Sequence, residues 1–236
     1  DPTAVDFLEG LNVPAYKIAS FEITDIPLIE YTALKGKPII LSTGIATKTD
    51  IRLAVEACRR AGNNDIALLK CTSSYPAPIE ESNLVMVKDL AERFDVISGL
   101  SDHTLGATAP LVATCMGAKI IEKHFILDKS IGGPDASFSL DEKEFKEMVD
   151  AVRIAEQALG NVDYTLTKKQ EAGKTFSRSL YVVNDLKSGE TITEKHVRSI
   201  RPGFGLHPKH LKDVMGKTVN QDLEKGTRFT LEFLND

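Results

Sequence analysis

Two histidines, His103 and His124, each follow a short apolar run and each has a carboxylate close by in the sequence. Asp102 directly precedes the first histidine, and Glu122 lies two residues before the second. Neutral imidazole is a common ligand for divalent metals, and a nearby carboxylate usually orients such a ring. The pair predicts a metal site with two protein ligands and open positions for substrate oxygens and water. The alternative is two hydrogen-bonded loop histidines without metal.

A second set of polar residues consists of lysines and serines near the ends of apolar runs. Lys17 and Lys70 interrupt segments that are otherwise apolar, and burying a lysine there costs free energy unless it meets an anion. Ammonium and hydroxyl groups are good donors to phosphate or carboxylate. The predicted anion site consists of Lys17, Ser20, Ser42, Lys70, Ser73 and Ser101. Solvated surface lysines are the alternative, and the sequence has no glycine-rich phosphate loop.

Two acidic residues and one arginine complete the candidates for chemistry. Glu22 follows the first apolar run, and Asp135 ends the segment 132–135 (GGPD), a loop with special backbone requirements. Both suit acid–base work or hydroxyl binding, whereas a turn aspartate bonded to its own backbone is the alternative for Asp135. Arg201 opens 201–205 (RPGFG), a turn that could present its guanidinium to a ligand, although a surface arginine is the alternative.

These residues must be positioned by a repeated strand–helix pattern in the first part of the chain. The predicted strands are 15–19, 38–41, 66–69, 96–99 and 119–123, and helices separate them. Apolar strands that alternate with helices indicate a parallel sheet covered on both faces. Polar residues after parallel strands meet at one rim. Because five units do not complete an eight-stranded barrel, the pattern fits a partial barrel or an open doubly wound sheet.

The composition changes near Gly160, which predicts a second domain. We expect a barrel-like domain over 1–160, a linker over 161–174 that could form a peripheral helix, and a small, mostly β domain over 175–236. Strands are predicted at 179–183, 197–200 and 227–230, separated by turn signals. A core this small is only marginally stable alone, so we expect it to dock on the first domain or on another subunit.

The overall composition limits the partners and the compartment. The chain has 236 residues, a net charge of -5 and three cysteines. An acidic balance without a basic run argues against nucleic acid or anionic membrane as partners. No apolar run approaches the roughly 18 residues of a spanning helix. Scattered cysteines, odd in number, suit reduced thiols, and we expect a cytoplasmic protein.

Five segments carry a resemblance to a known family. They are 16–22 (YKIASFE), 69–76 (LKCTSSYP), 99–104 (GLSDHT), 122–125 (EKHF) and 133–135 (GPD). In this order they resemble the sialic acid synthase family, which condenses phosphoenolpyruvate with an N-acetylated amino sugar. The turn that begins at Arg201 resembles part of that family's antifreeze-like SAF domain. The segments 136–140 (ASFSL) and 70–73 (KCTS) look more like the pseudaminic acid synthase branch, because sialate synthases usually have Asn after Cys-Thr.

The resemblance implies a fold and a role for each candidate. The fold is an α/β chain with about the last five units of a TIM (β/α)8 barrel, followed by a SAF domain. His103 and His124 would hold Mn²⁺ or Mg²⁺, and His124 also counts with Glu22 and Asp135 as catalytic. Phosphoenolpyruvate and sugar would be bound by Lys17, Ser20, Ser42, Lys70, Ser73, Tyr75 and Ser101. Phe176 and Arg201 would reach a partner's barrel in a domain-swapped homodimer.

The resemblance also implies the reaction. A cytoplasmic transferase would join phosphoenolpyruvate to 2,4-diacetamido-2,4,6-trideoxy-altrose and release phosphate by C–O cleavage, giving pseudaminic acid for cell-surface glycans. The metal would polarise the sugar aldehyde. The alternatives are N-acetylneuraminate synthesis from N-acetylmannosamine, a barrel aldolase with a Schiff base at Lys70 or Lys17, and a non-catalytic sugar or anion-binding module. The family's barrel begins before residue 4, so we expect the chain as given to lack the first strands and a catalytic glutamate, and to be inactive.

Overall fold

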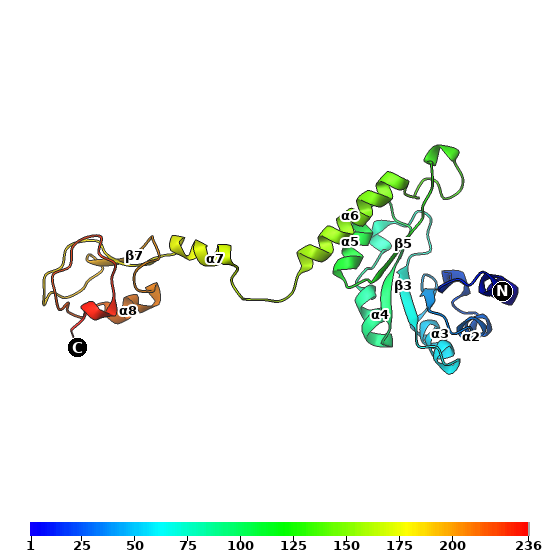
Figure 1. Ribbon diagram of the computed structural model, residues 1–236, viewed down its shortest axis with the longest axis horizontal. Coiled ribbons are helices and arrows are strands. Elements are labelled where there is room, and N and C mark those ends of the chain that lie inside the picture. Colours follow the sequence, from blue (N-terminus) through cyan, green and yellow to red (C-terminus); the bar gives the residue numbers. More distant parts are fainter. Residues whose placement is uncertain (236) are drawn as a thin grey trace. The chain divides into compact units, whose positions relative to one another are not determined.

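The computed structural model describes residues 1–235 and divides into two compact units, Asp1–Asn161 and Val162–Asp236 (Figure 1). The first unit contains five parallel strands with helices between them, as the sequence predicts. The second unit contains short strands and turns. No helix within residues 1–235 has the length and apolar character needed to cross a bilayer.

The sheet of the first unit is parallel, with the strands in chain order. Its strands are β1 (Tyr16–Ile18), β2 (Ile39–Ser42), β3 (Ile66–Cys71), β4 (Ile97–Asp102) and β5 (Ile120–Lys123). The register pairs Lys17 with Ile40, and Ser101 with Glu122. Because successive side chains of a strand point to opposite faces, this register fixes which residues share a face.

Helices connect and cover these strands. They are α1 (Pro2–Gly10), α2 (Ile26–Ala33), α3 (Lys48–Arg60), α4 (Met86–Phe94), α5 (Thr108–Cys115) and α6 (Glu142–Leu159), with a 3-10 turn, η1, at Ser20–Glu22. Reciprocal capping boxes start α3 and α6, because Thr47 and Asp141 each accept a backbone N–H three residues on. Helices α5 and α6 pack against each other (Figure 1).

The helices pack against only one face of the sheet. Ile18, Leu41 and Leu68 occupy this outer face and belong to the main core with residues of α1 to α4. Each of the three is at least nine-tenths buried, so the hydrophobic effect holds the helices on this side. The expectation of a sheet covered on both faces is therefore wrong. The inner face carries Lys17, Ser42, Ser101 and Glu122, together with apolar residues such as Leu69.

The sheet is strongly curved. Strands β1 and β5 are its two edges, and four strand spacings would separate them by about 19 Å in a flat sheet. Yet Lys17 Nζ on β1 lies 3.6 Å from Glu122 Oε1 on β5. The edges therefore bend toward each other, and the sheet forms part of a barrel wall, which decides between the two architectures that the sequence leaves open.

The second unit is a small β structure around its own core. Strands β6 (Ser179–Val182) and β7 (Val197–Ile200) pair antiparallel, and the short helices are α7 (Lys168–Gly173) and α8 (Leu211–Val214). Its core includes Leu180, Ile192 and Phe229, each almost fully buried. The predicted strand at 227–230 is wrong, since this segment makes only one isolated bridge, between Arg228 and Tyr181.

Candidate active site

Alternation along the strands sorts the predicted polar residues onto two faces. The register between neighbouring strands puts four of them on the inner face: Lys17, Ser42, Ser101 and Glu122. Lys70 has the opposite parity. Its Nζ donates to the Cys71 carbonyl at 2.7 Å and to Thr72 Oγ1 at 3.2 Å, and its register partner Leu100 belongs to an outer-face core. The structure therefore separates Lys70 from the other anion-site candidates.

A lysine, a glutamate and a serine meet at the centre of the inner face. Ser101 Oγ donates to Glu122 Oε1 at 2.6 Å, and Lys17 Nζ lies 3.6 Å from the same oxygen. The side chains of Lys17 and Glu122 are 31% and 42% exposed, so both remain accessible to a ligand. From the sequence, Glu122 is expected only to orient the His124 ring. Glu122 lies two residues before His124, so strand alternation places both side chains on the same face. This spacing is the signal that could have predicted Glu122 as a site residue.

A cradle of small polar groups forms beside this centre at the end of β2. The Gly44 N–H donates to Ser20 Oγ at 3.0 Å. A Cβ at Gly44 would lie 2.8 Å from Ser20 Oγ and 3.1 Å from Cys71 Sγ, and it would collide with Ser73 Oγ. Only glycine leaves this space open. Ser42 Oγ is buried without a hydrogen-bond partner among residues 1–235, so a bound anion would satisfy it.

The two histidines lie together in an aromatic cluster. The ring centroids of His103 and His124 are 5.1 Å apart, and the Tyr75 ring lies 4.3 Å from that of His103. Phe138, which is almost fully buried, packs 4.9 Å from the His124 ring. Rings from the segments that follow β3, β4 and β5 therefore fix both imidazoles. Phe138 belongs to the 136–140 segment that resembles the pseudaminic acid synthase branch, but nothing in that segment alone predicts its contact with His124.

Each imidazole is oriented by an oxygen at Nδ1. His103 Nδ1 lies 2.9 Å from the Thr72 carbonyl oxygen, and His124 Nδ1 lies 3.5 Å from Asp135 Oδ2. Neither Nε2 has a hydrogen bond among residues 1–235. An imidazole held at one nitrogen by an oxygen and free at the other is typical of metal ligands. The orienting groups differ from those expected, because Asp102 points to the outer face and Glu122 bonds to Ser101.

The electrostatics of the two rings differ. Burial and the neighbouring His103 lower the pKa of His124, which favours the neutral ring that binds metal. Burial also opposes protonation of His103, but its contacts with the Cys71 thiol and the Thr72 carbonyl outweigh burial and raise its pKa. Within residues 1–235 no group of three or more His, Cys, Asp or Glu side chains could hold a metal. The two neighbouring imidazoles alone could supply at most two protein ligands, and the remaining positions of a metal held there would go to water or substrate oxygens.

Three further candidates belong to other segments of the chain. Glu22 is exposed in η1, just beyond β1. Its side chain makes no hydrogen bond or ion pair within residues 1–235. Phe176 and Arg201 belong to the second unit, where the Phe176 side chain is 73% exposed. The turn after Arg201 is anchored, because Gly203 N–H donates to the Thr175 carbonyl at 3.0 Å.

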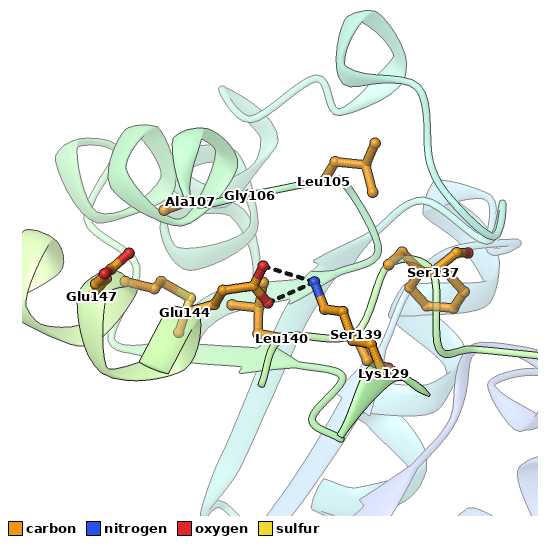
Figure 2. Close-up of a pocket in the computed structure, with 11 residues that line it drawn as sticks. Leu105, Gly106, Ala107, Lys129, Ser137, Ser139, Leu140, Glu144 and Glu147 are labelled. Carbon is orange, nitrogen blue, oxygen red and sulfur yellow. Dashed lines mark hydrogen bonds and ion pairs between the residues drawn. The ribbon is translucent and has the colours of Figure 1, made fainter. Parts of the chain in front are cut away.

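A cavity of about 320 Å³ lies between the segment that precedes α5, around residues 105–107, and the first turns of α6, at Glu144 and Glu147 (Figure 2). Leu105, Leu140 and Met148 line it, and Lys129 and Glu144 form an ion pair of 2.6 Å at its edge. Phe138 lines the cavity and also contacts His124, so it divides the cavity from the imidazoles. The cavity is therefore separate from the cluster that carries the chemistry.

The first unit has the architecture of a β/α-barrel protein, with lysine, carboxylate, hydroxyl and imidazole groups at the carboxyl ends of its strands. Comparison with known families identifies the group. The chain belongs to the NeuB family, whose model matches residues 1–164, and a SAF domain model matches residues 177–234. The resemblance inferred from the sequence motifs is thereby confirmed.

Individual relatives agree with this placement. The pseudaminic acid synthase of Helicobacter pylori is 48% identical over 225 residues, which are 95% of this chain and 66% of the relative. The N,N'-diacetyllegionaminic acid synthase of Legionella pneumophila is 36% identical and covers 99% of this chain and 67% of its own length. The crystal structure of the spore coat polysaccharide biosynthesis protein SpsE of Bacillus subtilis superposes with a TM-score of 0.65 at 35% identity, covering 100% of this chain and 71% of its own. The chain thus spans about two thirds of the length of these proteins.

Proposed function

We propose that the protein is a phosphoenolpyruvate-dependent nonulosonic acid synthase that makes pseudaminic acid. The observation that carries the proposal is the placement of Lys17, Glu122 and Ser101 beside two histidines with free Nε2 atoms. The similarity to the Helicobacter pylori pseudaminic acid synthase, at 48% identity, supports the choice of product. The 36% identity to a legionaminic acid synthase makes that product the less favoured one.

The anion would bind in the cradle at the end of β2. Lys17 supplies positive charge, and Ser20, Ser42 and Ser73 supply hydroxyl donors around the space that Gly44 leaves open. Charge-assisted hydrogen bonds of this kind are the strong ones and suit a phosphate or carboxylate. Lys70, on the outer face, is not part of this proposed site.

His103 and His124 would hold the divalent cation, Mn²⁺ or Mg²⁺, whose chemistry is to polarise the aldehyde of the open-chain amino sugar. Tyr75 lies against the His103 ring, and Asp135 lies beside His124, so both are placed to contact that sugar. A new C–C bond would form between the enol carbon of phosphoenolpyruvate and the aldehyde carbon. Water would then add to C2 of the former enol, and phosphate would leave with its bridging oxygen.

Glu122 is placed to manage the proton of the attacking water. Its Oε1 accepts from Ser101 and faces Lys17, whereas its Oε2 has no bond among residues 1–235 and is available to take a proton. Glu22 stays a proposed catalytic residue on the strength of the family resemblance alone.

We also propose a cytoplasmic homodimer in which Phe176 and Arg201 of one protomer complete the site of its partner. The exposure of the Phe176 side chain supports this proposal. Mixing a His103→Ala protomer with an Arg201→Ala protomer would test it, because each mixed dimer would then contain one intact site. Activity in the mixture but in neither variant alone is expected, and an inactive mixture that forms mixed dimers would contradict it.

The experiment that tests the proposed function offers the full-length protein phosphoenolpyruvate and Mn²⁺ with one of two sugars. One is a 2,4-diacetamido-2,4,6-trideoxy hexose of the altro configuration, and the other is N-acetylmannosamine. Phosphate release and product mass are measured for both. Faster turnover of the first sugar is expected. Faster turnover of N-acetylmannosamine would indicate a sialic acid synthase. A lysine adduct trapped by borohydride in the presence of substrate would indicate a Schiff-base aldolase. No phosphate release with either sugar would indicate a non-catalytic binding module.

A further inference from the structure

A buried ion pair lies directly behind the two histidines, on the outer face of the sheet. Lys123 Nζ lies 2.6 Å from Asp102 Oδ2, and the two side chains are 0% and 1% exposed. The register pairs these residues as the last pair of the β4–β5 ladder. They occupy no part of the proposed substrate site, because their parity directs both side chains away from the inner face.

The ion pair is part of a closed network that includes the segment after His103. Lys123 Nζ also donates to the Thr104 carbonyl, and Asp102 Oδ1 accepts from the Thr104 N–H at 2.9 Å. Thr104 itself is almost fully buried. The residues on both sides of His103 are therefore held by one network, and that network is anchored on the residue directly before His124.

No direct backbone bond joins the two histidines. The ladder ends one residue earlier, and their carbonyls accept from two different segments. The His103 carbonyl accepts from Ala77 N–H at 2.9 Å, and the His124 carbonyl accepts from Leu140 N–H at 2.9 Å. The Asp102–Lys123 pair is thus the last cross-strand bond before the two strand ends that carry the imidazoles.

Stability alone does not account for this pair. Removing two charges from water is expensive, and replacing a buried ion pair with apolar residues of similar volume is often neutral or stabilising. A short ion pair whose two members are both hydrogen-bonded to the Thr104 backbone does, however, fix the relative position of the groups that it joins. Here those groups are the backbones that carry His103 and His124.

We propose that Asp102 and Lys123 are positioning residues that set the spacing of His103 and His124 for one divalent cation. The inference rests on the metal site of the proposed function and assigns it two residues that touch neither metal nor substrate. Supporting residues behind metal ligands typically change metal affinity by about 10–100-fold when they are lost. An effect of that size is expected here.

The test is a double variant, Asp102→Leu with Lys123→Met, which removes both charges and keeps much of the volume. Binding of Mn²⁺ to the protein, without substrates, is measured from the electron paramagnetic resonance signal of the free ion, and thermal unfolding is measured in parallel. We expect a native melting temperature within a few degrees of wild type and Mn²⁺ affinity lowered by about 10–100-fold. Lys123→Arg, which keeps the charge beside Asp102, should recover part of the affinity.

The matched control is the Lys129–Glu144 pair, which joins the segment after β5 to α6 and does not flank a histidine. Lys129→Met with Glu144→Gln should leave Mn²⁺ affinity unchanged. Wild-type affinity in the folded Asp102→Leu, Lys123→Met variant would overturn the inference, as would equal loss in the control. If the double variant lost Mn²⁺ affinity but the wild-type protein made no product, only the proposed function would be contradicted. If the wild-type protein bound no Mn²⁺, the inference would be overturned whatever its products.

Discussion

Lys17 and Glu122 lie on the two edge strands of one five-stranded sheet, yet Lys17 Nζ and Glu122 Oε1 are 3.6 Å apart. Their proximity is a direct measure of how far the sheet bends. Because about a third or more of each side chain is exposed, water screens the pair and its contribution to stability is small. Its role is better explained by ligand binding, since it keeps an ammonium group on the concave face of the sheet.

Replacing Lys17 with methionine tests that role. The variant should bind phosphoenolpyruvate more weakly, because hydrogen bonds to a charged group contribute about 1.5–3 kcal/mol. This range corresponds to a rise of about 10–100-fold in the KM for phosphoenolpyruvate. The melting temperature should stay near that of wild type. Steady-state kinetics with varied phosphoenolpyruvate measures the effect.

Lys37→Met is the control for the Lys17 variant. Lys37 also pairs with a glutamate, with Nζ 3.1 Å from Glu9 Oε1, but it lies before β2, away from the carboxyl ends of the strands. Its KM for phosphoenolpyruvate should match wild type. A Lys17→Met protein with an unchanged KM would show that the anion binds elsewhere.

Gly44 offers a second test of the anion site. In Gly44→Ala, the new methyl group would displace the hydroxyls of Ser20 and Ser73, which rotate more easily than a backbone moves. We expect a loss of stability of about 1–3 kcal/mol from overpacking and a larger loss of phosphoenolpyruvate affinity. Isothermal titration with phosphoenolpyruvate and urea unfolding measure the two effects.

Gly10→Ala is the matched glycine control. A Cβ at Gly10, the last residue of α1, meets no atom within 4 Å. Alanine there should leave phosphoenolpyruvate binding unchanged and stabilise the helix by up to about 1 kcal/mol. If Gly44→Ala bound phosphoenolpyruvate as well as Gly10→Ala, the cradle would not be the anion site.

The two histidines make a third prediction. His103→Ala and His124→Ala should each abolish measurable Mn²⁺ binding, because a site with two protein ligands keeps only one after either change. His196, a partly buried histidine of the second unit whose Nε2 lies 3.5 Å from Glu190 Oε1, serves as the control. His196→Ala should bind Mn²⁺ like wild type. Retained metal dependence and rate in His103→Ala would show that the metal lies elsewhere.

The contrast between Lys17 and Lys70 shows what the sequence can and cannot predict. Both lysines interrupt apolar strands, so both look like anion ligands. Alternating strand–helix segments are local features, and they predict the five strands of the first unit and the helices between them. The face on which each lysine lies depends on the register between strands, which a single sequence does not contain. Register places Lys17 on the inner face and Lys70 among the helices.

The groups that orient the two histidines could not be predicted from the sequence for the same reason. Proximity along the chain suggests Asp102 and Glu122 as the groups that orient His103 and His124. Adjacent residues of a strand face opposite ways, so Asp102 pairs with Lys123 behind the sheet instead. The oxygen beside His124 comes from Asp135, in a loop eleven residues farther on. Only the folded chain brings that loop back.

The cysteines provide a prediction that depends on pH. Burial raises the pKa of the Cys58 thiol to about 11, so only about one part in a thousand is thiolate at pH 8. Burial acts the same way on Cys71, but its contacts with His103, Ser20 and Ser73 together outweigh burial and lower the pKa of that thiol. Cys115 is exposed. Iodoacetamide at pH 8 should therefore label Cys115 first, then Cys71, and Cys58 last.

Mass spectrometry of tryptic peptides over time measures this order. Because the thiolate is the reactive form, raising the pH from 8 to 9 should speed labelling of Cys58 by a larger factor than labelling of Cys71, whose thiol is already more ionised. Protein unfolded in urea is the control, in which all three cysteines should react at similar rates. If native Cys58 reacted as fast as Cys71 at pH 8, the prediction would be contradicted. Either the core between α3 and the sheet would then open readily, or the Cys71 thiol would not be ionised as its contacts require.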